Sequence, residues 1–450
     1  MRTKTKVADN PRLLAVNVLV NVIGKRKTLD QLLDAETQPL VRELVSGSLR
    51  HYFSLSQRID ELLTRKLRAK DLDVRCLMLV GAYQLLHTRI PDHAAVAETV
   101  GCTKALKKPW AKGLVNAVLR NLPPPNEEWS PAALQDHPHW FINLLRNSLP
   151  DHWLDILTAN NTRAPMTLRV NQRKVSAADY RELLKNKGLD SKPGALTETL
   201  NLVKPLSQNK LPGFDEGWVA VQDAAAQLAA VVASPGPNQR VLDACAAPGG
   251  KGFHLLERHR PEGQGEISLV MQDISENRIN TIHEQARRLG HSANDSLHIR
   301  QSDSSQPIDG DSQSFYDLIL LDAPCSGSGT VRRHPDIKVL RSAEDLQTLN
   351  STQSALLDAL WPRLAPGGRL IYSTCSLFQE ENDAIISAFI DRSGHELTLG
   401  DLPSRVPNHE LTPYLATRHG IQTLPTVDGG DGLYYAELIA PDPMRNEHKP

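Results

Sequence analysis

The chain has 450 residues and a formal net charge of −1, and 40% of its residues are apolar and 23% charged. This length exceeds what one hydrophobic core usually organises, so we expect two or three domains of a soluble globular protein. No apolar run approaches the roughly 18 residues of a membrane span, and the N-terminus lacks the apolar core of a secretion signal, so we expect a cytoplasmic protein. The five cysteines form no CxxC pair and have no histidine spacing that suits zinc, which argues against a disulfide framework or a metal site.

Charge is distributed unevenly along the chain. Residues 1–124 hold 21 lysines and arginines against 11 acidic residues, whereas the remaining residues hold 30 against 41. A basic segment joined to an acidic one suggests a nucleic-acid-binding module, because lysine and arginine neutralise phosphates. A solvated helical surface that happens to be basic is the alternative interpretation.

Residues 8–120 are predicted to be helical. Asn10 and Pro11 look like an N-cap followed by proline in the first turn, and an apolar residue then recurs at every fourth position. Similar patterns follow at Val41 to Leu49, Val74 to Leu86 and Val115 to Leu119. We therefore expect an all-helical domain over residues 1–140, with the proline-rich stretch 122–126 as a stiff linker near its end.

A small α+β domain is expected over residues 141–235, with a strand at 166–170 and helices at 177–187 and 223–232. Beyond it, short apolar strands alternate with helical patterns, which is typical of a doubly wound parallel sheet. This α/β domain should cover residues 236–440 and leave 441–450 as a tail. Its strands are expected at 241–244, 268–271, 297–300, 318–321 and 369–372.

The loops after these strands are the candidate binding sites, because ligands lie beyond the carboxyl ends of a doubly wound sheet. The loop at 241–251 has small residues that permit a close ligand and leads into a helix whose free N–H groups suit an anion. It matches neither a phosphate loop nor the GxGxxG pattern of nicotinamide binding. Asp273 ends the second strand, where it could bind ribose hydroxyls, and Asp303 follows the third, where it could contact an adenine amino group. Either aspartate could instead simply cap its own turn.

Two further loops each carry a cysteine. Cys325 follows the sequence Asp322-Ala-Pro after the fourth strand, and Cys375 follows the fifth strand. A thiolate that adds to C6 of a cytosine makes C5 nucleophilic enough to accept a methyl group, and a carboxyl at N3, such as that of Asp322, would relieve the negative charge that builds on the ring. Spacing alone does not decide which cysteine attacks. The other cysteines are interpreted as inert buried thiols: Cys76, Cys102 and Cys245.

Together these motifs resemble the NOL1/NOP2/Sun family of RNA 5-methylcytosine methyltransferases, which have a Rossmann-like catalytic domain. The matching stretches are Asp-Ala-Cys-Ala-Ala-Pro-Gly-Gly-Lys at 243–251, Leu-Asp-Ala-Pro-Cys-Ser-Gly at 321–327, Arg-Arg-His-Pro-Asp at 332–336, and Ser-Thr-Cys-Ser at 373–376 with Glu380, Glu381 and Asn382. The resemblance implies S-adenosyl-L-methionine as methyl donor, Cys375 as nucleophile, Cys325 as the cysteine that assists product release, and Asp322 as the catalytic carboxyl. The cofactor contacts that it implies are Ala247, Pro248, Gly249, Gly250, Lys251, Asp273, Arg278, Asp303 and Asp322, with no metal. The chain departs from the family pattern at Gly252, Gln379 and Leu433.

The front of the chain resembles the helical NusB RNA-binding domain at 12–22, 47–50, 91–100 and 115–120, and the middle resembles the family's small N1 domain at 168–171 and 221–227. A NusB-like domain fused to this catalytic domain implies 16S ribosomal RNA as the substrate of a monomer, without a DNA or membrane partner. The same chemistry on tRNA or DNA is an alternative. A non-catalytic RNA-binding assembly factor is another, but the presence of Asp322, Cys325 and Cys375 together argues against it.

Overall fold

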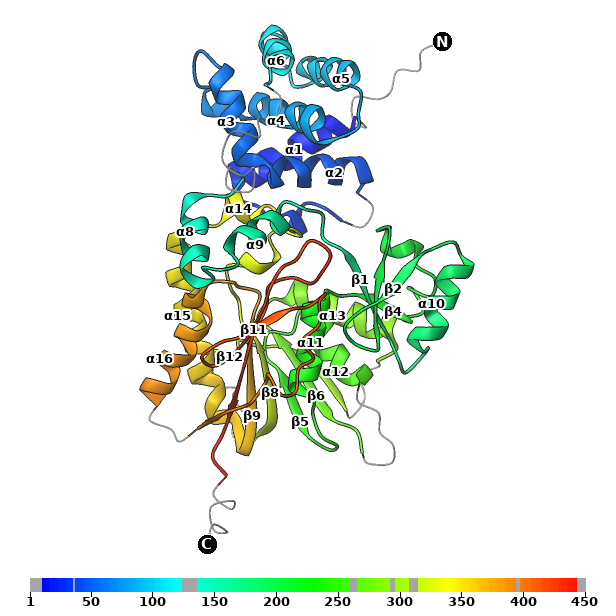
Figure 1. Ribbon diagram of the computed structural model, residues 1–450, viewed down its shortest axis with the longest axis vertical. Helices are drawn as coiled ribbons and strands as arrows, with labels where there is room; N and C mark the ends of the chain where they lie inside the picture. The colour runs from blue at the N-terminus through cyan, green and yellow to red at the C-terminus, as the bar shows by residue number, and fades with distance from the viewer. Residues whose placement is uncertain are drawn as a thin grey trace. The chain divides into compact units, whose positions relative to one another are not determined.

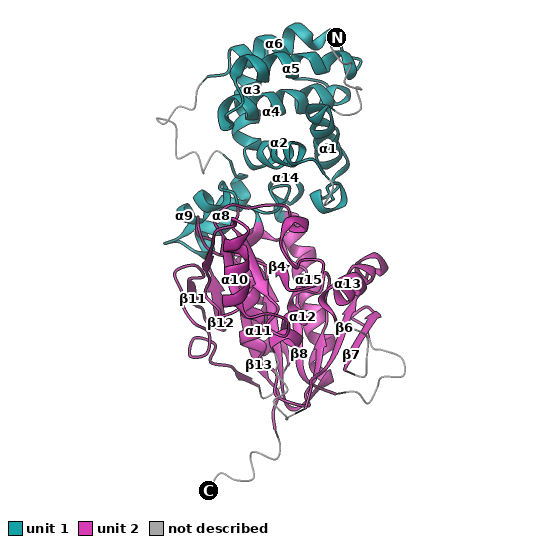
Figure 2. Cartoon of the chain, turned by 90° about the vertical axis from the view of Figure 1, so that its right-hand side faces the viewer, with its two compact units in different colours: residues 1–163, 331–343 teal, residues 164–330, 344–450 magenta. Residues whose placement is uncertain are grey.

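The computed structural model describes residues 10–34, 37–123, 136–258, 265–291, 296–306, 315–393 and 397–442. The chain divides into two compact units, of which the first comprises residues 1–163 and 331–343 and the second the remainder (Figure 2). These units follow packing rather than sequence motifs, so the domain limits expected at residues 140 and 235 remain predictions. None of the helices in the described ranges is long and apolar enough to cross a membrane.

The first unit is all-helical, as the sequence predicts (Figure 1). Its first helix begins as expected, because the Asn10 side chain accepts the backbone N–H of Arg12 at 2.9 Å and Pro11 occupies the first turn. The fourth helix is buried at every residue from Cys76 to Gln84 and packs against α1, α2, α5 and α6, which makes it the centre of the core. The helices are α1 (Pro11–Lys25), α2 (Pro39–Arg50), α3 (Tyr52–Leu62), α4 (Leu72–His87), α5 (Asp92–Ala105), α6 (Ala111–Arg120), α8 (His139–Ser148), α9 (Trp153–Asn160) and α14 (Ile337–Leu340).

The short helix α14 belongs to this unit although its sequence lies between two strands of the second unit. Its Lys338 side chain is buried and donates from Nζ to the carbonyl of Arg50 at 2.8 Å and to Oδ1 of Asn161 at 2.7 Å. Burial lowers the pKa of Lys338 to about 7. The helical unit therefore includes a stretch that the sequence motifs assign to the following domain.

The second unit begins with a small antiparallel sheet in the order β2-β3-β1-β4. Helix α10 (Ala177–Asn186) covers it and buries Tyr180 and Leu184 against the strands. Ser176 caps this helix by accepting the N–H of Asp179 at 3.1 Å. The strands are β1 (Met166–Val170), β2 (Ser191–Pro193), β3 (Thr199–Leu202) and β4 (Val219–Val221).

The large sheet of the second unit has nine strands in the order β11-β12-β13-β9-β8-β5-β6-β7, with β10 paired to β13. The five expected strands, β5 to β9, are present and parallel. The sheet is nevertheless mixed rather than purely parallel, because β13 runs antiparallel to β9. Beyond β13, the strands β12 and β11 extend the sheet, and each runs antiparallel to its neighbour. Hairpin connections give antiparallel pairs without a crossover helix. The strands are β5 (Arg240–Asp243), β6 (Ser268–Asp273), β7 (Leu297–Gln301), β8 (Tyr316–Asp322), β9 (Leu364–Thr374), β10 (Thr398–Leu399), β11 (Tyr414–Ala416), β12 (Gly420–Thr423) and β13 (Tyr434–Ile439).

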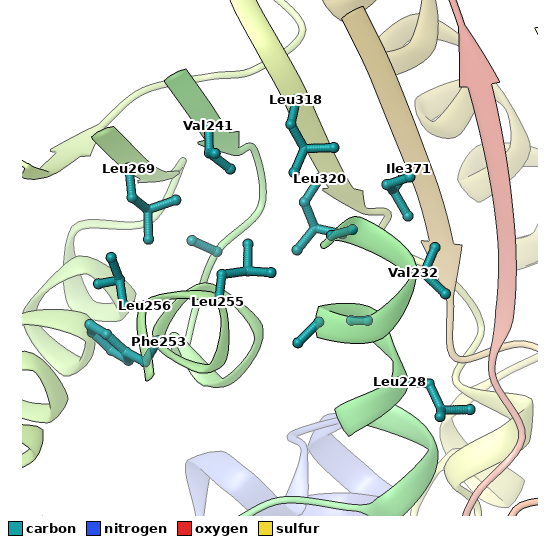
Figure 3. Packing of buried hydrophobic residues seen from close by; sticks show 14 of the residues in the cluster. Leu228, Val232, Val241, Phe253, Leu255, Leu256, Leu269, Leu318, Leu320 and Ile371 are labelled. Carbon is teal, nitrogen blue, oxygen red and sulfur yellow. The ribbon is translucent and has the colours of Figure 1, made fainter. Parts of the chain in front are cut away.

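Helices cover both faces of this sheet, because successive side chains of each strand point to opposite sides. On one face, Val241, Leu318 and Leu320 pack with α11 (Ala224–Ala233) and α12 (Gly250–Arg258), as Figure 3 shows. The same cluster includes α13 (Glu276–Leu289). On the other face, a second cluster joins the alternate strand residues to α15 (Ala343–Leu360) and α16 (Asp383–Ser393).

The strand order places a switch point between β5 and β8. From β5 the chain proceeds outward through β6 and β7, and from β8 it proceeds through β9 in the opposite direction. A crevice for a ligand forms beyond the carboxyl ends of strands at such a point. The loops that follow β5 and β8 therefore frame the candidate site.

Candidate active site

The loop between β5 and α12 has the close-approach geometry expected of a ligand cradle. Gly249 has a φ of +101°, and a Cβ atom there would lie 2.4 Å from the Phe253 ring, so only glycine fits. The backbone N–H of Gly249 donates to the Ala246 carbonyl at 2.7 Å. Helix α12 starts directly at Gly250, so its first N–H groups can donate hydrogen bonds to an anionic group.

A buried carboxyl without a partner lies at the base of this loop. Asp243 ends β5 and is 1% exposed, and neither of its carboxyl oxygens accepts a well-formed hydrogen bond from the described part of the chain. Burial, followed by the charge of Asp322, raises the pKa of Asp243 to about 7, although the charge of Lys251 and the backbone N–H of Gly252 act in the opposite direction. Buried polar groups are normally satisfied. An orphaned carboxyl here therefore fits a site that receives hydrogen-bond donors from a bound ligand.

The two aspartates expected to bind the cofactor lie at the ends of neighbouring strands. Asp273 Oδ2 accepts the backbone N–H of Ala247 at 3.3 Å and lies 3.5 Å from Nη1 of Arg278, so the structure brings the glycine loop, Asp273 and Arg278 together. Asp303 follows β7, and its Oδ1 accepts the N–H and the hydroxyl of Ser305 at 2.9 and 2.7 Å. Asp303 thus caps its own turn, and a cofactor contact by it remains a prediction.

Lys251 and Asp322 meet across the switch point as an ion pair. The Asp322 Oδ1 atom also accepts the hydroxyl of Ser373 at 3.1 Å, which ties the end of β8 to β9. Burial disfavours the ammonium form of Lys251, but the charge and hydrogen bond of Asp322, followed by the charge of Cys375, outweigh this and raise the Lys251 pKa. The lysine expected as a cofactor contact therefore also supplies a fixed positive charge near Cys375.

The two cysteines expected to act together do lie together. The Sγ atoms of Cys325 and Cys375 are 3.3 Å apart, and neither cysteine forms a disulfide. The pKa of Cys325 is raised well above its ordinary value, first by its hydrogen bond with Cys375, then by burial, and then by the charges of Cys375 and Glu381. The geometry therefore brings the two thiols within hydrogen-bonding distance of each other.

The remaining cysteines have no such arrangement. Burial raises the pKa of Cys102 to about 11 and that of Cys76 to about 12, and it raises the pKa of Cys245 further. All three thiols are protonated at neutral pH, which suits an inert role. Within the described ranges, no group of three or more histidine, cysteine or acidic side chains could hold a metal ion.

Two groups at the site were not assigned a role from the sequence. Asp243 lies inside a motif that the sequence singles out, but its burial follows from its position under α12 and is not visible in the pattern. Glu381 follows the second cysteine by six residues and is completely buried between the two cysteine loops. Its hydrogen bond with Ser326, 55 positions away in the sequence, gave no local signal.

A Rossmann-like sheet with a glycine loop and acidic strand ends beside its switch point defines a class of proteins that bind a nucleoside-containing ligand there, and the comparisons narrow this class to methyltransferases. Residues 230–439 match the family described as 16S rRNA methyltransferase RsmB/F. Residues 9–123 match the NusB family, and residues 137–208 match the ferredoxin-like domain of RsmF/B-like methyltransferases. The three matches follow one another along the chain in the order of the helical bundle, the small sheet and the large sheet.

Relatives match over nearly the whole chain. Ribosomal RNA small subunit methyltransferase B of Pseudomonas syringae pv. tomato is 42% identical over 446 residues, which cover 96% of this chain and 97% of the relative. A probable ribosomal RNA small subunit methyltransferase B of Coxiella burnetii is 43% identical, with 94% and 97% covered. The chain therefore belongs to the RsmB/F family of 16S rRNA methyltransferases.

Solved structures share the fold. The crystal structure of PH0851 is similar with a TM-score of 0.78 at 22% identity, and the similarity covers 95% of this chain and 98% of that one. The structure of NSun6 from Pyrococcus horikoshii with SFG has a TM-score of 0.55 at 20% identity and covers 67% of this chain and 98% of that one. These likenesses support the fold and not a particular substrate.

Proposed function

We propose that the protein transfers the methyl group of S-adenosyl-L-methionine to carbon 5 of a cytosine in 16S ribosomal RNA. The observation that carries this proposal is the pair of thiols, 3.3 Å apart, at the switch point beside the Lys251–Asp322 ion pair. Cytosine C5 is too poor a nucleophile to take a methyl group unaided, so the reaction needs a covalent step that a thiolate can provide.

Cys375 is assigned as the nucleophile. Cys375 is the thiol whose charge raises the pKa of the nearby Lys251, whereas the hydrogen bond with Cys375 and burial raise the pKa of Cys325. This asymmetry supports the same assignment as the family resemblance. Attack forms a bond between Sγ and C6, and the electron pair of the C5–C6 double bond moves into the ring toward N3 and O2.

Asp322 is assigned to the base. Lys251 and Ser373 both contact its Oδ1 atom, which leaves Oδ2 for the N3 edge of the cytosine. A proton held between this carboxyl and N3 stabilises the negative charge as it develops in the ring. Cys325 is assigned to the later step in which the C5 proton is lost and Cys375 is released.

The cofactor loop fits a ligand with an anionic end and a sugar. The bound cofactor supplies a methyl group on a positively charged sulfur. The start of α12 would bind the carboxylate of the cofactor, and Asp273 would bind its ribose hydroxyls. The unsatisfied oxygens of Asp243 would accept hydrogen bonds from the cofactor. Arg278 would act through Asp273, and Asp303 would contact the adenine amino group.

The choice of 16S ribosomal RNA rests on the family, on the NusB match and on the basic front segment. The test is to map 5-methylcytosine in total RNA from cells with and without the gene, and then to restore the mark in vitro with purified protein and cofactor. We expect loss of one 5-methylcytosine in 16S RNA. A mark lost from tRNA or DNA instead would support the alternative substrates, and no lost mark would support an assembly factor without catalysis.

A further inference from the structure

Trp110 is exposed at the start of α6. Its side chain is 53% exposed, and it is the only exposed tryptophan among the residues that the structure describes. Backbone hydrogen bonds close the turn that carries it, from the N–H of Lys108 to the Thr103 carbonyl and from the N–H of Ala111 to the Lys108 carbonyl, both at 2.9 Å. Lys107 has a φ of +57°, which ends α5 and turns the chain toward α6. The indole is therefore held on a well-connected turn.

A second loop lies directly beside this turn. Lys108 donates from Nζ to the Lys70 carbonyl at 3.0 Å and to Oδ1 of Asp71 at 2.6 Å, so it joins the α5–α6 turn to the loop between α3 and α4. Asp71 is itself buried. Residues 63–73 and 104–112 therefore form one continuous surface of the helical unit, the basic face.

Positive charge dominates the basic face. Its sequence holds eight lysines and arginines against two acidic residues, Asp71 and Asp73. Both carboxylates contact Lys108, and Asp71 also pairs with Arg68. The other six cations of the face are all exposed: Arg65, Lys66, Lys70, Lys104, Lys107 and Lys112.

The setting of Trp110 distinguishes it from a scattered surface residue. A single exposed apolar side chain needs no functional explanation, and none is needed for most of those in this chain. Trp110 instead lies on a face whose cations attract phosphates. Phosphate contacts carry no information about bases, whereas an aromatic ring stacks on any base whose face is open. A cationic surface combined with an exposed ring is typical of proteins that bind single strands.

We propose that Trp110 is a stacking platform for an unpaired base of the RNA substrate, and that the six exposed cations bind the phosphates on either side of that base. In a duplex, neighbouring base pairs cover both faces of a base, so only a single-stranded segment can use the platform. The inference rests on the proposed function in taking RNA as the partner. It adds that the helical unit prefers a single-stranded segment of that RNA to a duplex.

The test measures RNA binding without cofactor, so it gives a result whether or not methylation is observed. The full chain is titrated with a short labelled single-stranded RNA, with the same strand annealed to its complement, and with an abasic strand of equal length that keeps the phosphates. Trp110→Ala should weaken binding of the single strand by about fivefold or more, and binding of the duplex and the abasic strand by less than about twofold. Trp110→Phe should keep most of the affinity, because a phenyl ring also stacks.

Phe315→Ala is the matched control, because it removes another exposed aromatic ring, 52% exposed, from the second unit. It should bind all three RNAs as the parent does. Replacing Lys66 and Lys70 by glutamine should weaken binding of all three alike and reduce its dependence on salt. An unchanged single-strand affinity in Trp110→Ala would overturn the proposal. An equal loss for the abasic strand or the duplex would overturn it too, because the indole would then support the loops rather than a base.

Discussion

Lys251, in the loop after β5, forms an ion pair with Asp322 at the end of β8. The pair spans the switch point of the sheet and fixes a positive charge close to Cys375. The glycine loop and the cysteine loop are thereby linked through charge as well as through the strands that carry them.

We expect Lys251→Met to slow the formation of the covalent RNA adduct by at least about tenfold, because the Cys375 thiolate loses its neighbouring cation and Asp322 its partner. Single-turnover kinetics with saturating cofactor would measure the rate. Lys185→Met, on the exposed surface of α10, is the control and should react at the parent rate. An unchanged rate in Lys251→Met would show that the ion pair is only structural.

The buried carboxyl of Asp243 should make stability depend on pH. Its folded pKa of about 7 lies above the ordinary value of 3.8, so its contribution to stability is complete below pH 4 and is lost as the pH rises to 7. Asp243→Asn removes this loss. The free energy of unfolding of the variant relative to the parent should therefore rise between pH 4 and pH 7, by a few kcal/mol at most since one pKa unit corresponds to about 1.36 kcal/mol.

Denaturant unfolding of the cofactor-free protein at several pH values would measure this difference. The exposed Asp401→Asn substitution serves as the control and should track the parent at each pH. A difference between Asp243→Asn and parent that stays constant with pH would mean that Asp243 is ionised across the whole range in the folded protein.

Much of the fold can be predicted from local sequence patterns. Most differences between the predicted and the observed elements arise where distant segments of the chain pair with each other. The strand expected at 369–372 runs from Leu364 to Thr374, because Leu364 pairs with Tyr316 despite the proline and two glycines that interrupt the apolar pattern. Strand β13 was not predicted as a strand, since its residues from Tyr434 to Leu438 are buried on both faces and show no alternation.

The reactive residues at the ends of strands could be predicted from the sequence. The residues that hold them in place come from distant segments and could not be predicted. Cys325, Cys375 and Asp322 follow adjacent strands, so their proximity could be inferred from the order of elements. Two partners of Glu381 lie in other elements, Ser326 in the loop after β8 and Gln353 in α15, and both are common residue types without a pattern. Asp303 shows the reverse case: the sequence predicts that it contacts the cofactor, but in the structure its carboxylate accepts a hydrogen bond from its own turn.

The cofactor loop depends on a buried ion pair with the small sheet. Arg169 in β1 makes a bidentate pair with Glu257 in α12 at 2.8 and 2.9 Å and donates to the Gly250 carbonyl at 2.6 Å. We expect Arg169→Met to cost about 3–5 kcal/mol in the free energy of unfolding, because it leaves Glu257 buried without its principal partner. Arg392→Met, which breaks an exposed pair with Asp358, should cost less than about 1 kcal/mol.

Urea titrations of the two variants would measure both costs. Adding Glu257→Leu to Arg169→Met should recover part of the loss, since no charge then remains buried. Equal costs for the buried and the exposed pair would contradict the role given to Arg169.

The helical unit should contribute RNA affinity through phosphate contacts. Lys104, Lys107 and Lys112 are exposed on and beside α5 and α6, and replacing all three by glutamine should weaken binding and reduce the dependence of affinity on salt. Each lost phosphate contact should lower the slope of log K against log salt concentration by roughly 0.7–0.9. Filter binding of 16S RNA at several salt concentrations would measure this, and the exposed pair Lys185→Gln and Lys187→Gln at the end of α10 is the control. An unchanged slope in the triple variant would place the RNA contacts elsewhere.

The division of labour between Cys375 and Cys325 is the central claim, and the adduct on a denaturing gel tests it most directly. Cys375→Ala should form no covalent complex with RNA and lose all turnover, because no thiol attacks C6. Cys325→Ala should still attack and transfer the methyl group, so the complex should accumulate as a slowly migrating band when protein, 16S RNA and S-adenosyl-L-methionine are mixed. A band trapped by Cys375→Ala and absent from Cys325→Ala would contradict the account and make Cys325 the nucleophile.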